Sequence, residues 1–372
     1  MTDGRWQLTD SEVNYFQVCQ LPSVICYLFS TFLIFAVFME KKKEIVLSGI
    51  RPTGFVHLGN YFGALRNWAR MQDEYDCYFC IVDWHSLTTH PDTKELRGNV
   101  LRLMAELIGS GIDPEKCVLY IQSDVPEIAE LYLYLNMLAY KGELEKTATF
   151  KDKVRQQPDN VNAGLLTYPV LQSADILIHR AVKIPVGKDQ EQHIEMTRNF
   201  AERFNYRYGP VFPLPYAFNY GDELIKIMSL DGSRKMSKSE NQMNTLLFAD
   251  ADDMIQKKIM RAKTDNGPSI PNSVKPNYIE GLFTLMKVVS DPAITNKFDS
   301  DFNNCTIRYG DMKKQLAEDM IKFIAPIREK ISFIQKDEKY MNEVMEQGAA
   351  KARTSAKATL QLVKDAMGLK YY

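Results

Sequence analysis

Beyond its N-terminal segment, the chain alternates short apolar runs with longer stretches in which apolar positions recur every three to four residues. Apolar runs at residues 45–47, 77–82 and 117–122 have the length and the β-branched or aromatic content of buried strands. Stretches at residues 58–73 and 96–110 follow the helical period. Because strands that alternate with helices build βαβ units, the pattern predicts an α/β fold with a mostly parallel sheet.

The second half of the chain continues this alternation and then becomes helical. Residues 184–186 indicate another strand, which lies between helical patterns at residues 171–179 and 190–204. Beyond residue 250 the strand signals fade, and the alanine-rich stretch at residues 348–367 has high helix propensity. We therefore expect a sheet-containing domain followed by a largely helical C-terminal part.

The N-terminal segment contains an apolar run at residues 21–38 that is long enough to span a membrane. Acidic residues precede the run and lysines follow it, so a membrane helix here would leave the rest of the chain on the cytoplasmic side. Alternatively, translation begins at Met39, which leads directly into the first strand. We favour this second interpretation and predict that residues 1–38 are not part of the fold.

Composition narrows the possible partners and the cellular compartment. The 46 basic residues nearly cancel the 47 acidic ones, so any contact with nucleic acid must be local. Six cysteines without a regular framework are typical of reduced thiols in a cytoplasmic protein. Cys77 and Cys80 form one CxxC pair, but a zinc site usually needs a second pair or nearby histidines. We therefore interpret both as small apolar residues of a buried strand, and we predict no metal ligand.

Two short segments carry the strongest chemical signal. Residues 52–60 read PTGFVHLGN at the predicted turn from strand to helix, and residues 235–239 read KMSKS. The second lies in a polar, glycine-containing segment, residues 231–239, that predicts a mobile loop. Together and in this order, the segments resemble the HIGH and KMSKS elements of class I aminoacyl-tRNA synthetases. The resemblance implies activation of an amino acid by ATP.

The residue types in these segments suit that reaction. When a substrate carboxylate attacks the α-phosphate of ATP, negative charge concentrates at phosphorus and on the departing pyrophosphate, and positive donors must stabilise it. His57 and Asn60 share one face of the first helical turn, near the positive end of the helix dipole. Gly59 leaves room for adenosine, whereas Lys235 and Lys238 could close over the phosphates. No protein base or nucleophile is required, and Mg²⁺ is expected on the phosphates without an assigned protein ligand.

The resemblance can be narrowed to bacterial-type tryptophanyl-tRNA synthetases. It extends from about residue 44 to the carboxyl terminus, through GLLTYP at residues 164–169, ADIL at 174–177, PVGKDQ at 185–190 and HIEMTR at 193–198. It implies a Rossmann-like catalytic domain with a helical insertion at residues 39–235 and an α-helical domain on the anticodon side at residues 236–372. It also implies a cytoplasmic homodimer that uses L-tryptophan, ATP and tRNA(Trp), with no membrane partner.

The same resemblance assigns residues to the substrates. The acceptor of the indole N–H falls on Asp175, the partners of the substrate ammonium fall on Tyr168 and Gln190, and His85 lines the ring. A buried carboxylate would reject phenylalanine, because it would lose its hydrogen bond when the indole N–H is missing. The residues implied to bind ATP are Arg51, Pro52, Thr53, Gly59, Asn60, Gly187, Lys188, Asp189, Ile227, Lys235, Met236, Ser237, Lys238 and Ser239.

Two alternatives remain open. Tyrosyl-tRNA synthetases share the spacing of Tyr168, Gln172 and Asp175, but they place a tyrosine where this chain has Leu47, so a phenolic substrate would lose a hydrogen bond. A nucleotidyltransferase of the same superfamily would split ATP with similar elements but would need no helical tail. Contacts with tRNA phosphates are expected from local basic residues, namely Lys257, Lys258, Arg261 and Lys263.

Overall fold

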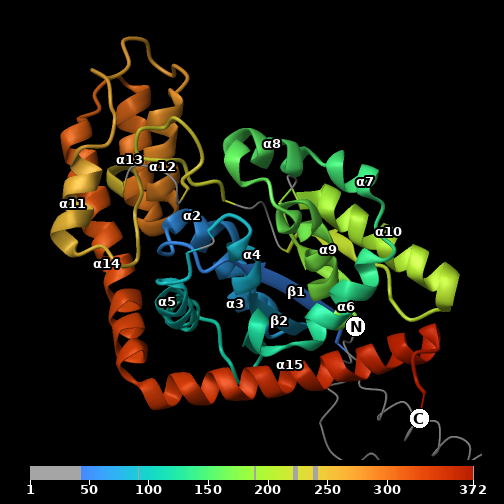
Figure 1. Ribbon diagram of the computed structural model, residues 1–372. Helices are drawn as coiled ribbons and strands as arrows, with labels where there is room; N and C mark the ends of the chain where they lie inside the picture. Colours follow the sequence, from blue (N-terminus) through green and yellow to red (C-terminus); the bar gives the residue numbers. More distant parts are fainter. Residues whose placement is uncertain (1–42, 91, 188–189, 221–224, 238–241, 372) are drawn as a thin grey trace, which may run out of the picture. The chain divides into compact units, whose positions relative to one another are not determined.

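A five-stranded parallel sheet lies at the centre of the fold, with the strand order β3-β2-β1-β4-β5 (Figure 1). The computed structural model describes residues 43–371 except 91, 188–189, 221–224 and 238–241, so the predicted extension at residues 1–38 lies outside the described residues. The strands are β1 (Ile45–Ile50), β2 (Asp76–Ile81), β3 (Val118–Ile121), β4 (Lys183–Pro185) and β5 (Tyr216–Phe218). The predicted α/β fold with a parallel sheet is confirmed.

Helices connect the strands as the sequence pattern predicted. The first connection is a continuous helical segment with a wide π turn in its middle, where residues 58–73 were expected to be helical. The helices before β5 are α2 (Leu58–Asn60), η1 (Tyr61–Leu65), α3 (Arg66–Met71), α4 (Asp83–Leu87), α5 (Leu96–Gly109), η2 (Gln122–Asp124), α6 (Glu127–Asn136), α7 (Lys141–Glu145), α8 (Ala148–Gln156), η3 (Pro158–Asn160), α9 (Ala163–Ile178) and α10 (Glu191–Tyr208).

The C-terminal part is helical, as expected. It comprises η5 (Gln242–Asn244), α11 (Asp252–Met260), α12 (Asn277–Val289), α13 (Pro292–Asn303), α14 (Tyr309–Lys336) and α15 (Glu338–Met367). None of the helices in the described part of the chain has the length and apolar character needed to cross a membrane. The predicted division into domains at residue 235 stays a prediction.

Alternate residues of the strands feed two apolar clusters, one on each face of the sheet. Val46 and Phe79 belong to the cluster formed with α3, α5, α11, α12 and α14. Leu47 and Tyr78, their neighbours in sequence, belong to the cluster formed with α6, α9, α10 and α15. Successive strand side chains point to opposite faces, so a sheet buried on both sides requires the continuous apolar runs that the sequence contains.

The CxxC pair follows the same rule. Cys77 and Cys80 are three positions apart on β2, and they lie in the two different clusters, on opposite faces of the sheet. Burial raises the pKa of the Cys80 thiol well above its usual value. The two thiols therefore cannot coordinate one metal ion together. Within the residues that the structure describes, no three His, Cys, Asp or Glu side chains gather in a way that could hold a metal.

Helix α15 crosses the edge of the sheet at β3. Its residues before Gly348 include Met341 and Val344 of one cluster, and its residues after Gly348 include Ala352 and Ala356 of the other. Figure 1 shows α15 as a long helix running along the sheet from α14 toward α6. At the crossing, a Cβ atom built on Gly348 would overlap the carbonyl oxygen and carbon of Leu119. The edge strand is therefore covered by a helix that needs glycine at this position.

Replacing Gly348 with alanine is expected to lower the free energy of unfolding by at least about 1–3 kcal/mol, because the new methyl group collides with backbone that cannot rotate away. Urea unfolding measures the change. The matched control is Gly98→Ala in α5, where a Cβ would meet no atom within 4 Å. That variant should be stabilised by roughly 0.5–1 kcal/mol, since alanine favours helix. Equal effects of the two variants would contradict the close contact.

Candidate functional site

The predicted site residues lie at the carboxyl ends of the strands. Arg51 and His57 follow β1, His85 follows β2, and Gly187 follows β4. From β1 the chain builds outward to β2 and β3, and then it returns to add β4 on the other side of β1. The crevice outside the carboxyl ends of the strands, where the order reverses, is the usual ligand site of open α/β sheets. The topology alone therefore brings these separate segments to one place.

The side chain of His57 caps the N-terminus of the first helix, α2. Its Nδ1 accepts the backbone N–H of Asn60 at 3.2 Å, and the Asn60 Oδ1 accepts the backbone N–H of His57 at 3.3 Å, which makes a reciprocal capping box. An imidazole that accepts through Nδ1 in its neutral form carries its proton on Nε2. The cap thus fixes the orientation of both side chains, and it turns hydrogen-bond donors, His57 Nε2–H and Asn60 Nδ2–H, away from the cap.

The described part of the KMSKS-like segment meets this helix start. The backbone N–H of Met236 donates to the carbonyl of Ile227 at 2.9 Å, which closes a hairpin, and Lys235 pairs with Met228 across it. Met236 is 2% exposed, and a Cβ atom built on Gly59 would lie 3.3 Å from the Met236 Cβ. Two segments about 180 residues apart are therefore in close contact. Lys235 itself stays exposed on the hairpin.

The turn of this hairpin is tightly restrained. Asp231 Oδ1 accepts the Ser229 hydroxyl at 2.6 Å and the Ser233 backbone N–H at 3.0 Å, and these hydrogen bonds lower the pKa of the Asp231 carboxyl. Gly232 has a φ of 70°, and a Cβ there would overlap the backbone of Tyr278 in α12. The segment expected to be a mobile loop is thus anchored in its first half. Lys238 and Ser239 lie outside the described residues, as do Lys188 and Asp189.

Asp175, which is 3% exposed, lies at the centre of a second group of polar side chains. Its Oδ2 is 2.9 Å from His85 Nε2, and its Oδ1 accepts the side-chain N–H of Gln122 at 2.8 Å. The Gln122 Oε1 in turn accepts the backbone N–H of Trp84, one residue before His85. The segments that follow two neighbouring strands, β2 and β3, therefore orient one buried carboxylate. Because a carboxylate offers about four acceptor positions, Asp175 can still accept another hydrogen bond.

Tyr168 lies on the same helix as Asp175, two turns earlier. Its hydroxyl is 2.7 Å from His193 Nε2, and the same nitrogen is 3.0 Å from the Thr149 hydroxyl. The Tyr168 ring also contacts the His85 ring edge-on, with the ring centroids 6.2 Å apart. Gln190, the N-cap of α10, stands one turn before His193. The three residues predicted to hold the amino acid, together with His85, thus come from α9, α10 and α4.

A positively charged region connects the two groups. Arg51 lies near enough to Tyr168 for their charges to interact, and its Nη1 donates to the Thr89 hydroxyl at 3.4 Å. Arg51 keeps contact with solvent, yet desolvation lowers its pKa. Desolvation also lowers the pKa of Lys153 in α8, and the neighbouring Arg51 charge lowers it further. Arg51 and Lys153 are therefore two neighbouring cations near Tyr168, and such a pair attracts a polyanion.

Gly187 lines a cavity of about 100 Å³ between the end of β4 and the first helical segment. Gly63, in the π turn of that segment, lines the opposite side, and a Cβ there would meet no atom within 4 Å. The wall also includes Val186, Asn67 and Tyr220. The π turn and two glycines therefore leave space beside the middle of the first helical segment. Of the remaining predicted residues, Pro52 and Ile227 are buried and Thr53 is half-buried in the β1 loop.

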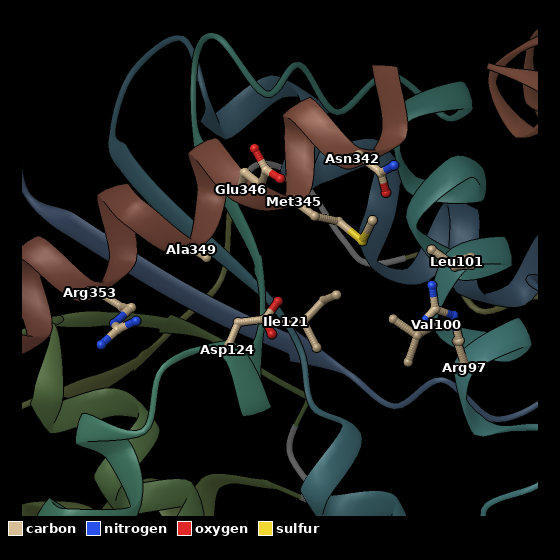
Figure 2. A pocket seen from close by; sticks show the side chains of 10 residues that line it. All are labelled: Arg97, Val100, Leu101, Ile121, Asp124, Asn342, Met345, Glu346, Ala349 and Arg353. Carbon is tan, nitrogen blue, oxygen red and sulfur yellow. The ribbon is translucent and has the colours of Figure 1, made fainter. Parts of the chain in front are cut away.

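A larger cavity, of about 470 Å³, lies apart from these residues (Figure 2). Figure 2 shows side chains from α5, the end of β3, η2 and α15 around one space. Asp124 faces it, and burial together with the nearby Asp83 raises the pKa of the Asp124 carboxyl, against the effect of Arg353. The lining carries two arginines and two acidic residues, so it presents no net charge. None of the predicted site residues lines this cavity.

One of the basic residues predicted to meet tRNA phosphates is in the wrong place. Lys258 is 2% exposed, and its ammonium donates to both carboxylate oxygens of Asp250 at 2.7 Å and to the Thr245 carbonyl at 2.9 Å. A buried lysine stays charged only when it is paired in this way, so Lys258 stabilises the fold and cannot reach a phosphate. The exposed basic residues of this region are Lys257, Arg261 and Lys263.

Several polar residues of the site were missed from the sequence. Gln122, Lys153 and His193 each lie next to a predicted site residue. None of them lies in the two phosphate-binding segments, and the resemblance assigned none of them a role. Gln122 had one available signal, because it is a polar residue at the carboxyl end of a buried strand, where α/β proteins place ligand contacts. The role of Lys153 depends on a distance to Arg51 that only the fold determines.

Known proteins match most of the length of this chain. The family model for class I tRNA synthetases (W and Y) matches residues 39–325 of the chain. The chain is 56% identical over 328 residues to the tryptophan–tRNA ligase of Porphyromonas gingivalis, covering 88% of this chain and 100% of that protein. It is 41% identical to the tryptophan–tRNA ligase of Clostridium tetani over 332 residues, which cover 89% of this chain and 97% of that protein.

Solved structures show the same arrangement. The chain resembles the tryptophanyl-tRNA synthetase of Campylobacter jejuni complexed with ADP and tryptophan, with a TM-score of 0.78, 32% identity, and coverage of 87% of this chain and 99% of that one. It also resembles the tyrosyl-tRNA synthetase of Aeropyrum pernix, with a TM-score of 0.59, 18% identity, and coverage of 89% of this chain and 92% of that one, a likeness that shows the fold alone.

Proposed function

This chain belongs to the class I tRNA synthetases of the tryptophan and tyrosine family, and from that premise we propose how its residues activate L-tryptophan with ATP and transfer it to tRNA(Trp). The observation that carries the proposal is the contact of the Met236 segment with the Gly59 helix start. In the first step an oxygen of the tryptophan carboxylate bonds to the α-phosphorus of ATP as pyrophosphate leaves. In the second, a terminal ribose hydroxyl of the tRNA attacks the carbonyl carbon and releases AMP.

Asp175 recognises the substrate side chain in this proposal. Its carboxylate, oriented by His85 and Gln122, accepts the indole N–H in a charge-assisted hydrogen bond. The Tyr168 hydroxyl, oriented by His193, and the side chain of Gln190 hold the substrate ammonium. With the side chain and the ammonium both held, the carboxylate is directed toward the helix start. Where the amino acid binds, catalysis therefore consists of positioning the ionised tryptophan carboxylate, which is the nucleophile.

The helix start and its neighbours stabilise the charge that develops on phosphate. The capping box aims the donors of His57 and Asn60 at the α-phosphate, where the first helical turn also presents backbone N–H groups. Arg51, Lys153 and Lys235 supply positive charge for the departing pyrophosphate, and Lys238 is assigned the same role. Adenosine is assigned to the side of the first helical segment that Gly187 and Gly63 line. Since the capping box already orients the donors of His57 and Asn60, little reorganisation of these two side chains is needed at the transition state.

Mg²⁺ would accompany ATP as a ligand of its phosphate oxygens. It prefers oxygen ligands and usually keeps several waters when it binds nucleotide phosphates. In this site it would neutralise phosphate charge, and we assign it no protein ligand. The chain's own contribution is the set of cations and N–H donors described above.

Tryptophan is favoured over tyrosine by an apolar residue of β1. Leu47, at the position where tyrosyl-tRNA synthetases carry a tyrosine, is 4% exposed and packs in the apolar cluster with α9 and α10. It offers no partner for a phenolic hydroxyl, which would lose about 1 kcal/mol or more on burial. The family match and the helical C-terminal part favour a synthetase over a nucleotidyltransferase that does not use tRNA.

We further propose that the protein works as a cytoplasmic homodimer. Leu133, Met137 and Tyr140 are 51%, 72% and 63% exposed, and their spacing places them on one side of α6 and the turn after it. A second copy of the chain would cover this apolar stripe. The four cysteines among the described residues are free thiols, and a reducing cytoplasm would keep them so. The tRNA phosphates would meet Lys257, Arg261 and Lys263.

ATP–pyrophosphate exchange with the purified protein tests the proposal. The assay is run separately with tryptophan, with tyrosine and with no amino acid. We expect exchange that depends on tryptophan and exceeds the tyrosine rate by a factor of at least about 10³, because tyrosine lacks the indole N–H that Asp175 accepts and Leu47 offers no partner for its hydroxyl. Exchange with tyrosine alone would overturn the substrate assignment. Exchange without an amino acid would favour a nucleotidyltransferase.

A further inference from the structure

Helix α5 carries a buried charged residue that the reaction described above does not use. Glu106 is 2% exposed, and its neighbours in the helix, Ala105 and Leu107, are fully buried in the apolar cluster. Burying a carboxylate in such surroundings is costly unless hydrogen bonds compensate. At such a depth in an apolar helix face, leucine would avoid the free-energy cost of burying a charged group. The carboxylate therefore needs an explanation beyond packing.

The Glu106 side chain contacts the residue that precedes His57. Both carboxylate oxygens lie within hydrogen-bond distance of the Val56 backbone N–H, at 3.3 and 3.2 Å. Val56 is fully buried, so its N–H has no access to solvent there. On its other side, the Val56 carbonyl accepts the backbone N–H of Phe248 at 3.3 Å. The polar groups of Val56 are thus held by α5 and by the segment that follows the KMSKS-like loop.

The same helix also holds the residue before Val56. The guanidinium of Arg102, one turn before Glu106, lies 4.1 Å from the centroid of the Phe55 ring. The loop needs such support, because Gly54 turns it with a φ of 65° and it includes no regular element until the helix begins. Two side chains of one rigid helix therefore fix two successive residues of the loop.

We propose that Glu106 is a positioning residue for adenylate formation. Given the function proposed above, on which this inference rests, Glu106 holds the Val56 backbone N–H so that the loop between β1 and α2 presents His57 and Arg51 to ATP. Loss of the acceptor lets the loop shift, and small displacements of catalytic groups cost large factors in rate. Helix α5, which carries Glu106, packs in the cluster on one face of the sheet, whereas α9, which carries Asp175, packs in the cluster on the other face. We therefore expect tryptophan binding to be independent of Glu106.

Three variants separate positioning from simple stability. Glu106→Gln keeps an acceptor of the same length, Glu106→Asp withdraws it by one methylene, and Glu106→Leu removes it while it restores an apolar surface. In ATP–pyrophosphate exchange we expect Glu106→Gln to stay within about threefold of wild type in kcat/KM for ATP. Glu106→Leu should lose on the order of 10- to 100-fold, and Glu106→Asp should fall between them. Equilibrium binding of tryptophan without ATP should be unchanged in all three.

Urea unfolding of the same variants shows whether a loss of activity merely follows a loss of stability. If kcat/KM for ATP followed stability across the three variants, Glu106 would be only structural and the proposal would be wrong. Wild-type kinetics in a folded Glu106→Leu would also overturn it, and Glu106→Asp provides the same test if the leucine variant does not fold. Failure of the proposed function looks different, because wild-type protein would then show no exchange that depends on tryptophan.

Discussion

Asp175→Asn is expected to reduce kcat/KM for tryptophan by on the order of 100-fold while the protein still folds and binds ATP. A hydrogen bond to a buried charged group contributes roughly 1.5–3 kcal/mol, and each 1.4 kcal/mol is a factor of ten. Asparagine keeps the shape of the side chain, and its Oδ1 can still accept from Gln122. Its Nδ2, however, carries donors and cannot accept the indole N–H.

The measurement is steady-state ATP–pyrophosphate exchange with tryptophan and with phenylalanine as the competing substrate. We expect the ratio of kcat/KM for tryptophan to kcat/KM for phenylalanine to fall steeply. The variant has no charged acceptor that would be left unpaired when the indole N–H is missing. Asp253→Asn on the exposed face of α11 is the matched control and should behave as wild type. An unchanged ratio in Asp175→Asn would mean that another group recognises the indole.

The central strands could be predicted because burial on both faces leaves a strong signal. β1, β2 and β3 fall within three residues of the apolar runs at residues 45–47, 77–82 and 117–122. β5 was missed because it has only three residues, Tyr216–Phe218, of which two are exposed at the edge of the sheet. A short, exposed edge strand has neither a continuous apolar run nor a regular alternation.

Helix α9 shows a different limit of the sequence pattern. The helical pattern was recognised only from residue 171, yet the helix begins at Ala163 and contains Pro169. Proline removes one backbone donor and normally ends or kinks a helix, which hid the first two turns. Packing of the helix against α6 and α10 outweighs that local cost. As a result Tyr168 and Asp175 share one rigid helix, which aligns the two predicted substrate contacts.

Long-range supports of the site were beyond the sequence. The resemblance supplied His85, Tyr168 and Asp175, but the partner Gln122 comes from the end of a strand that is not adjacent in sequence to any of them. Lys258 illustrates the opposite error. It was predicted as an exposed tRNA contact, because a lysine-rich helix resembles a phosphate-binding surface, but its burial depends on Asp250 eight residues earlier. Composition shows charge, whereas only the fold shows where charge is paired.

Lys235→Ala is expected to lower kcat for adenylate formation by on the order of 10²–10³-fold, with little change in the binding of tryptophan. Lys235 is exposed on the hairpin closed by the Met236–Ile227 hydrogen bond, beside Gly59. Its ammonium acts on charge that develops on the leaving pyrophosphate, and removing one such preorganised group costs about this factor. Because the interaction strengthens toward the transition state, kcat should fall more than the affinity for ATP.

Single-turnover formation of the adenylate, measured against equilibrium binding of ATP and tryptophan, separates these effects. Lys226→Ala, also exposed and on the opposing strand of the same hairpin, is the matched control for loss of a positive charge. We expect it to change the rate by less than about threefold, since a single exposed charge that contacts no substrate contributes little. If both variants slowed the reaction equally, the hairpin would act only through its general positive field. If Lys235→Ala instead raised the Kd of ATP without slowing the chemical step, its role would be uniform binding, and the hairpin would not stabilise the transition state.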